Sequence, residues 1–446
     1  MPVFVQKSML AGDGGPSPIV CMARLLGVRC RDIFLKGGLL TIWAARLSDF
    51  VPVQRTLPRS SVFDTGVGEP IPDPVRFLQK NGAQFLVYSF DFDQRVLGFV
   101  KVREGIDIRK APFLYQAQRA NAEELLLLPF DILPAVADGL EKTQLAVKNI
   151  CLYNTGRCGS TLMCKALDVI SEVQAVSEPD VFQVIIERVC KKDVPLSSDE
   201  RNEIIKLLKC SVILLNFYFQ QKDPSRKVIC YKLRSDAIFI ADLIQKAAPM
   251  AKTIFMYRDL PGFYDSCLNL RFNGSYWRYF VETTLRLDVF SRVPVLKTDL
   301  PIFKYASEHP SMIECPVTHG VPFLYVSLWI LQMQKAFDLI QEDSENFFHE
   351  CLTFKQLLAY KERIILKVLE KLDVYVPSDV NSYKIRDVFG VDSQQGSVMQ
   401  SGRRQGNSGR SWVGTWEKNL FSTTLEHYNG DVDVPDFVLP NTVIME

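Results

Sequence analysis

The segment Ile150–Asp180, ICLYNTGRCGSTLMCKALDVISEVQAVSEPD, contains the residue types and spacing that most directly suggest chemistry. Apolar residues up to Asn154 predict a strand, and a turn with two glycines leads into a helix that begins near Ser160. Such a turn directs several backbone N–H groups at one point, and the positive end of the helix dipole adds to them. Arg157 supplies a fixed positive charge. The segment suits a phosphate-like dianion; a helix-capping turn without a ligand is the alternative interpretation.

A second segment places another arginine in a comparable position. The predicted strand Thr253–Tyr257 ends in Arg258, and Ser266 follows eight residues later. An arginine at the carboxyl end of a parallel strand lies where such sheets bind ligands. Ser266, about two turns into the next helix, can add a hydroxyl to the same anion. A strand-end salt bridge and a surface hydroxyl are the alternative for this pair.

The loop differs from that of ordinary nucleoside triphosphatases. Gly156 and Gly159 are three residues apart, and no lysine precedes Ser160. The pattern Gly-x-x-x-x-Gly-Lys-Ser/Thr is absent from the sequence, which disfavours a kinase or nucleoside triphosphatase.

From residue 147 onward, short apolar runs that predict strands alternate with stretches of helical periodicity. The predicted strands are Val147–Tyr153, Val173–Val176, Lys227–Leu233 and Thr253–Tyr257. The predicted helices are Thr161–Ile170, Glu203–Phe219, Asp236–Ala247, Phe323–Ile340 and Phe354–Leu372. This alternation indicates an α/β fold with a parallel β-sheet flanked by helices on both faces.

The length of 446 residues suggests two to three domains. Residues 1–110 read as a mixed α+β N-terminal region of unknown role, with predicted strands at Leu39–Ala45, Ala83–Phe92 and Val96–Val102. Residues 111–146 read as a helical connector, because Ala122–Leu128 and Ile132–Leu145 have helical spacing of apolar residues. Residues 147–446 form the predicted α/β domain.

Composition excludes several classes of protein. Lys plus Arg is 52 and Asp plus Glu is 51, and this balance argues against nucleic acid or an anionic membrane surface as partner. No apolar run reaches the 18 residues of a membrane span, and the N-terminus lacks the pattern of a signal peptide, so we expect a cytoplasmic protein. The 11 cysteines include no Cys-x-x-Cys pair, so we expect buried, reduced thiols and no metal site.

The two anion-directed segments together resemble the sulfotransferase family, which uses 3′-phosphoadenosine 5′-phosphosulfate as sulfuryl donor. The stretch TGRCGSTL is similar to the family's 5′-phosphosulfate loop, and the stretch from Tyr257 to Ser266 is similar to its 3′-phosphate motif. The resemblance implies that Arg258 and Ser266 bind the donor's 3′-phosphate. It implies that the phosphosulfate end is bound by Thr155, Gly156, Arg157, Cys158, Gly159, Ser160 and Thr161. It also implies a catalytic role for Arg157, which would stabilise charge on the bridging and terminal oxygens.

Further candidates follow from the same comparison. Ser177-Glu178-Pro179 resembles a Ser-Glu-Pro element of one soluble branch of the family, which makes Glu178 the candidate general base. Asp180 is a possible substitute, and a turn-forming carboxylate is the alternative for Glu178. Lys232, near the end of a predicted strand, is a candidate catalytic cation or a solvated strand-end lysine. None of the four histidines lies in a strand-end context near the loop: His309, His319, His349 and His427.

A basic segment near the C-terminus completes the comparison. Arg403, Arg404 and Gly406 precede the stretch GTWEKNLF, residues 414–421, and resemble the family element that closes over the nucleotide. The resemblance covers residues 147–421 and implies a P-loop NTPase-like fold.

The resemblance also implies a function. We expect sulfuryl transfer to a hydroxyl or amine of a small-molecule or carbohydrate acceptor, without a metal. A non-catalytic nucleotide-binding or scaffold protein derived from a sulfotransferase is the alternative. The sequence leaves the acceptor and the oligomeric state open.

Overall fold

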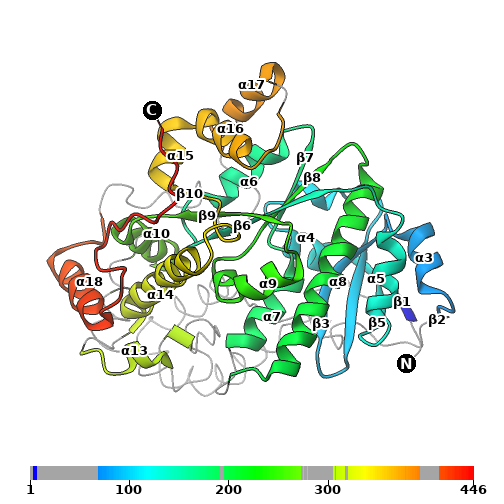
Figure 1. The fold of residues 1–446 in the computed structure, drawn as a ribbon, viewed down its shortest axis with the longest axis horizontal. Helices are drawn as coiled ribbons and strands as arrows, with labels where there is room; N and C mark the ends of the chain where they lie inside the picture. The colour runs from blue at the N-terminus through cyan, green and yellow to red at the C-terminus, as the bar shows by residue number, and fades with distance from the viewer. Residues whose placement is uncertain are drawn as a thin grey trace, which may run out of the picture.

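The computed structural model of the protein describes residues 4–7, 69–190, 195–272, 275, 279, 305–306, 308–316, 320–376, 378–391 and 411–445. Within these residues the chain forms two sheets of five strands each. In Figure 1 the parallel sheet occupies the centre and the antiparallel sheet lies to the right.

The central sheet is parallel throughout, with the strand order β10-β9-β6-β8-β7. Its strands are β6 Lys148–Asn154, β7 Val173–Ser177, β8 Val228–Lys232, β9 Lys252–Tyr257 and β10 Glu350–Thr353. Side chains alternate between two cores, as the period of two in a strand requires. On β6, Ile150 and Leu152 enter one cluster of buried apolar residues, and Cys151 and Tyr153 enter the other. These strands confirm the predicted α/β class.

Helices cover both faces of this sheet (Figure 1). One core receives α6 Ser160–Asp168, α15 Phe354–Tyr360, α16 Glu362–Lys371 and α17 Ser378–Val388. The other receives α7 Asp180–Cys190, α8 Ser198–Lys222, η3 Ser235–Ile240, α9 Ala241–Ala247, α10 Leu260–Phe272, α13 Pro310–Ile313, α14 Gly320–Glu342 and α18 Thr415–Tyr428. The single helix predicted over 354–372 is broken at Lys361, whose φ of 47° is left-handed.

The second sheet is antiparallel, with the order β2-β1-β5-β4-β3. Its strands are β1 Phe4–Lys7, β2 Glu69–Pro70, β3 Phe85–Asp91, β4 Val96–Val102 and β5 Ala122–Pro129. The accompanying helices are α3 Pro74–Asn81, η2 Ile108–Lys110, α4 Leu114–Asn121 and α5 Leu133–Glu141. Strands β3 and β4 confirm two predicted strands, whereas the strand predicted at 39–45 lies outside the described residues.

The helix predicted over 122–128, within the expected helical connector, is wrong. These residues form β5, which pairs with β4 on one side and β1 on the other. A short apolar run fits a buried strand as well as a helix, and tertiary pairing decided between them. One cluster of buried apolar residues joins Leu126 of β5 to Leu215 of α8 and Trp329 of α14, so the core continues past residue 146. The proposed domain boundaries stay predictions.

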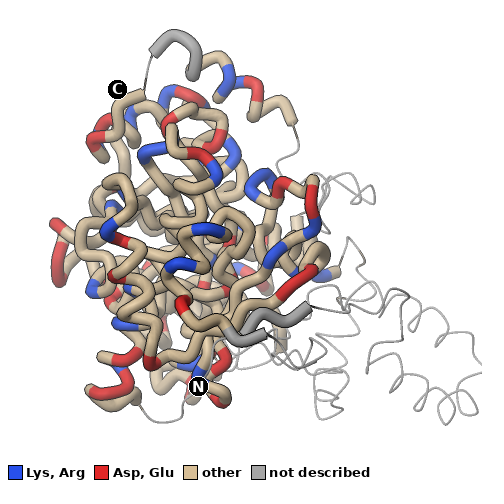
Figure 2. Tube along the Cα trace, turned by 90° about the vertical axis from the view of Figure 1, so that its right-hand side faces the viewer, with Lys and Arg blue, Asp and Glu red and all other residues tan. Residues whose placement is uncertain are grey.

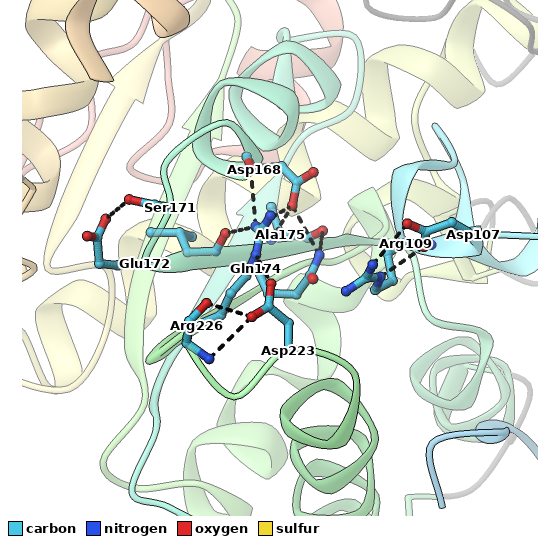
Figure 3. Close-up of polar contacts among 11 residues, drawn as sticks. Asp107, Arg109, Asp168, Ser171, Glu172, Gln174, Ala175, Asp223 and Arg226 are labelled. Atoms are coloured by element: carbon cyan, nitrogen blue, oxygen red, sulfur yellow. Dashed lines mark hydrogen bonds and ion pairs between the residues drawn. The ribbon is translucent and has the colours of Figure 1, made fainter. Parts of the chain in front are cut away.

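Strand β7 is an edge of the parallel sheet, and a polar network covers it near its amino end (Figure 3). The carboxylate of Asp168 accepts hydrogen bonds from the Ala175 amide at 3.2 Å and from Gln174 Nε2 at 3.1 Å. Arg226 Nη1 donates to the same carboxylate at 3.1 Å. Because the outer backbone groups of an edge strand are not paired by a neighbouring strand, this network matters: it satisfies the Ala175 amide and the Val173 carbonyl.

Basic and acidic residues are interspersed along the described chain, as Figure 2 shows. Among the described residues, no helix is both long enough and apolar enough to cross a membrane. The cytoplasmic location stays a prediction.

Candidate functional site

The predicted site residues gather at the carboxyl edge of the parallel sheet. Glu178 directly follows β7, Lys232 ends β8, the glycine loop follows β6, and Arg258 follows β9. Strand β6 lies between β8 and β9, and the chain leaves it toward β7 on one side before it returns to β9 on the other. Such a point of reversal is where parallel sheets bind ligands.

The loop after β6 is braced by both neighbouring strands. Asn154 Nδ2 donates to the Leu233 carbonyl at 2.8 Å, and Asn154 Oδ1 accepts from the Gly156 amide at 2.9 Å. The Thr155 amide donates to the Met256 carbonyl at 3.0 Å. The loop is therefore held before any ligand binds.

Three residues of the loop adopt left-handed backbone conformations. The φ angles are 79° at Gly156, 54° at Arg157 and 81° at Gly159. A Cβ at Gly159 would lie only 2.9 Å from Phe354 Cδ2, so close packing against α15 also requires glycine there. Gly159 is the N-cap of α6 and provides no side-chain cap, so the N-terminal amides of α6 are not capped from that position.

The remaining loop residues are largely buried beneath the helix start. Ser160 and Thr161 are 5% and 7% exposed, and Cys158 is fully buried. Burial raises the pKa of the Cys158 thiol, and the positive charge of Lys232 offsets this only in part. A thiol held in its neutral form is a poor nucleophile, so Cys158 fills space beneath the loop.

The two segments expected to meet lie in contact. Arg157 Nε donates a hydrogen bond to Ser266 Oγ at 2.9 Å, and Arg258 Nη1 donates to the Arg157 carbonyl at 3.4 Å. All three side chains are partly exposed. The pKa of Arg258 is lowered, chiefly by burial and further by the charge of Arg157, while Asp259 opposes the shift. Two guanidinium groups that repel each other beside a hydroxyl form a suitable place for an anion.

Arg258 is fixed from several sides. Its guanidinium lies 4.6 Å from the ring centroid of Phe354, and Trp329 Nε1 donates to its carbonyl at 2.7 Å. The neighbouring carboxylate of Asp259 is paired with Lys355 at 3.1 Å. Phe354 thus contacts both arms of the site, the glycine loop and Arg258.

The other half of the site is an ion pair between Glu178 and Lys232. Lys232 Nζ donates to Glu178 Oε1, and Arg234 Nε lies 3.5 Å from Glu178 Oε2. The Lys232 and Glu178 side chains are 4% and 14% exposed. Glu178 has a left-handed φ of 55°, and its amide donates to the Lys232 carbonyl at 2.7 Å. This strained backbone conformation occurs at the residue whose carboxylate reaches Lys232 on the neighbouring strand β8.

A deeper network, which the sequence interpretation missed, supports this pair. The fully buried carboxylate of Asp180 contacts Arg234 at 2.6 Å and Arg119 at 2.5 Å. The Tyr115 ring lies 4.2 Å from the guanidinium carbon of Arg234 and 5.2 Å from that of Arg119. Arg234 lies two residues after Lys232, just past the carboxyl end of β8. This position could have identified it from the sequence as a candidate site residue. Nothing in the local sequence pointed to Arg119 or Tyr115, which both belong to α4.

The candidate segment near the C-terminus lies only partly within the described residues. Arg403, Arg404 and Gly406 lie outside the described residues. The Ser411 hydroxyl donates to Asp265 Oδ1 at 3.1 Å, and the Trp412 amide donates to the same oxygen at 2.6 Å. The segment that follows the candidate basic residues is therefore anchored to α10, beside Ser266.

One histidine and the absence of a metal-binding cluster bear on other kinds of chemistry. His349 Nδ1 accepts from the Thr253 amide at 3.2 Å, which places this histidine near the amino end of β9, away from the loop. Within the described ranges, no group of three or more His, Cys, Asp and Glu residues is arranged to hold a metal ion.

The fold and the site together define an α/β protein with an anion-directed loop at the carboxyl edge of a parallel sheet. No family model matches the chain, and no curated protein matches it either. The resemblance to sulfotransferases therefore stays an expectation from the sequence motifs within residues 147–421.

Proposed function

We propose that this protein is a sulfotransferase that moves a sulfuryl group from 3′-phosphoadenosine 5′-phosphosulfate to a hydroxyl or amine of an acceptor. The convergence of Arg157, Arg258 and Ser266 beside the N-terminus of α6 is the observation that carries the proposal. A donor with two anionic ends needs two neighbouring anion sites. The helix N-terminus supplies one, and the paired arginines supply the other.

The strand order suggests how the donor would lie. Strands β9 and β8 flank β6, about 10 Å apart by the usual strand spacing. The 3′-phosphate would lie on the β9 side with Arg258, and the phosphosulfate would lie over α6. The sulfuryl group would then face Lys232 and Glu178 on the β8 side, where an acceptor would approach.

In the proposed reaction the acceptor oxygen or nitrogen attacks sulfur. The bond between sulfur and the bridging oxygen breaks, and its electron pair stays on the 5′-phosphate of adenosine 3′,5′-bisphosphate. The acceptor proton passes to Glu178. Lys232 and the amides of α6 would stabilise the negative charge that develops, and each such donor contributes about 3 kcal/mol in comparable oxyanion sites.

The ion pair of Glu178 with Lys232 favours the alternative function, a nucleotide-binding protein without turnover. A carboxylate held by two cations is a weaker proton acceptor than one that is not. For catalysis, the donor must draw Lys232 toward its own negative charge and release Glu178. A protein that binds the nucleotide but leaves this pair closed would not transfer the group.

Titration calorimetry followed by a transfer assay tests the proposal. We expect adenosine 3′,5′-bisphosphate to bind without magnesium, and radiolabelled donor to lose its sulfuryl group to members of a panel of hydroxyl and amine acceptors. Binding without transfer to any acceptor would favour the non-catalytic alternative. Tight, magnesium-dependent binding of ATP without bisphosphate binding would refute both.

A further inference from the structure

Segment 113–119, which opens α4, lies against the carboxyl end of β8. The Phe113 ring lies 5.5 Å from Nζ of Lys232, the last residue of that strand. The Tyr115 ring lies 4.2 Å from the guanidinium carbon of Arg234, two residues further along the chain. All four side chains are buried, and aromatic faces attract cations more strongly where water is excluded. Segment 113–119 therefore holds the two cations that flank the proposed base.

Arg119 connects the same segment to the base through a chain of charges. Its Nη2 donates to Asp180 Oδ2 at 2.5 Å, and the other oxygen of that carboxylate accepts from Arg234 Nη2 at 2.6 Å. Arg234 Nε in turn lies 3.5 Å from Glu178 Oε2. Cation and anion alternate from α4 to the end of β7. Because coupling follows such continuous contacts, a change at Arg119 would reach Glu178.

The antiparallel sheet fixes α4 in this position. Gln118 is fully buried, and its Nε2 donates to the Val87 carbonyl of β3 at 2.9 Å. Arg119 also shares a side-chain hydrogen bond with Tyr88, the next residue of β3. Residues 1–110, for which the sequence suggested no role, therefore supply part of the support for α4.

Stability alone is a weak explanation for charges at this interface. One apolar core already joins the two sheets, and it includes Leu114 of α4 and Phe182 of α7. Apolar side chains in place of a buried ion network are often neutral or stabilising. Buried charges that end on a candidate base therefore favour a role at that base.

We propose that segment 113–119 is a positioning element for sulfuryl transfer, which holds Glu178 and Lys232 in their reactive arrangement. Arg119 acts on Glu178 through Asp180 and Arg234, and Phe113 acts on Lys232 directly. The inference rests on the proposed function, because it concerns the same base. The contacts of the segment lead to the half of the site that holds Glu178, so its loss should lower turnover and spare nucleotide affinity.

Steady-state kinetics and calorimetry of Arg119→Gln test the assignment. Kinetics uses radiolabelled donor with an acceptor that the panel identifies, and calorimetry uses adenosine 3′,5′-bisphosphate. We expect kcat per folded molecule to fall about 10-fold or more, because small displacements of reacting groups are costly. The bisphosphate affinity should stay unchanged. Arg119→Lys keeps a cation opposite Asp180 and should recover part of the lost kcat.

Two further variants make the result interpretable. Phe113→Leu removes the ring face beside Lys232 but keeps an apolar side chain, and its kcat should fall about threefold or more at unchanged affinity. It keeps the inference testable if Arg119→Gln does not fold. Arg95→Gln is the matched control, because Arg95 also joins the antiparallel sheet to a helix on the parallel sheet, by its 2.8 Å pair with Glu203 of α8. Its kcat and affinity should not change.

The outcomes separate this inference from the proposed function. A wild-type kcat in folded Arg119→Gln or in Phe113→Leu would overturn the inference alone. Equal losses of kcat and affinity would also overturn it, because general damage to the site would then explain them. A similar fall of kcat in Arg95→Gln, or no recovery in Arg119→Lys, would do the same. A wild type that transfers to no acceptor would instead refute the proposed turnover, and the inference with it.

Discussion

Arg157 and Ser266 are 109 positions apart in the chain, yet Arg157 Nε donates a hydrogen bond to Ser266 Oγ at 2.9 Å. One residue belongs to the loop after the central strand β6, and the other to the helix that follows its neighbour β9. Their contact joins two segments that each carry an arginine. This contact converts two separate anion-directed patterns into one candidate site.

Arg258 is predicted to contribute mainly to nucleotide affinity. Arg258→Gln should weaken binding of adenosine 3′,5′-bisphosphate by about 100-fold, because charged donors to phosphate are worth several times a neutral hydrogen bond. Calorimetry measures the effect. Arg271→Gln, at the C-terminal end of the helix α10 that follows Arg258, is the control and should bind normally. Unchanged affinity in Arg258→Gln would remove this arginine from the anion site.

Glu178 is predicted to contribute to turnover and not to affinity. Glu178→Gln should lower kcat by about 100-fold or more, the usual loss when a general base is removed. Bisphosphate affinity should not fall, because Lys232 loses a competing carboxylate. Steady-state kinetics and calorimetry give the two values. Glu172→Gln, just before the other end of β7, is the control; full turnover in Glu178→Gln would exclude Glu178 as the base.

Gly159 is predicted to be required by packing as well as by its φ angle. Gly159→Ala places a Cβ 2.9 Å from Phe354, whereas Gly105→Ala has a similar φ of 82° and no heavy atom within 4 Å. Gly105→Ala should therefore cost about 1 kcal/mol of unfolding free energy from backbone strain. Gly159→Ala should cost roughly 1–3 kcal/mol more because of overpacking. Urea unfolding measures both, and equal costs would show that the contact with α15 is unimportant.

Asp180 is predicted to stabilise the fold by neutralising two arginines. Asp180→Asn leaves Arg119 and Arg234 without their shared carboxylate, and breaking a buried ion pair costs about 3–5 kcal/mol. Asp107→Asn disrupts the more exposed pair with Arg109 and should cost less than about 1 kcal/mol. Chemical unfolding of the two variants tests the contrast. A small loss in Asp180→Asn would mean that the network contributes little to stability.

Asp168 is predicted to give a measurable pH dependence to stability. Burial raises the pKa of this carboxyl, and Arg226 opposes the shift. At pH values below the unfolded-state pKa of about 3.9, the raised pKa of Asp168 adds to the stability of the folded protein. This added stability is lost as the pH rises through the folded-state pKa. Asp168→Asn keeps Oδ1 as an acceptor for Ala175 and cannot ionise. Relative to wild type, the variant should gain stability as pH rises from below the unfolded pKa through the folded pKa of Asp168; a constant or opposite difference would contradict the shift.

Local sequence patterns predicted much of the fold. The strands β3, β4, β6, β7, β8 and β9 and the helix α6 form close to where apolar periodicity placed them. Residues 122–128 were misread, because a short apolar run next to Pro129 fits either a helix or a buried strand. Its pairing with β4 and β1 depends on residues 20 or more positions away, which no local window includes.

Within the candidate site, chain order by itself determined which residues end the parallel strands: Lys232, Arg258, Glu178 and the glycine loop. This holds because successive parallel strands bring their carboxyl ends to one edge whatever the side chains between them. Only the tertiary structure decided which partner each charge meets: Arg157 with Ser266, Glu178 with Lys232, and Asp180 with Arg119 of α4. The physical reason is that side-chain direction follows from left-handed backbone angles and from packing between distant elements. Neither is encoded in the spacing of residues along one segment.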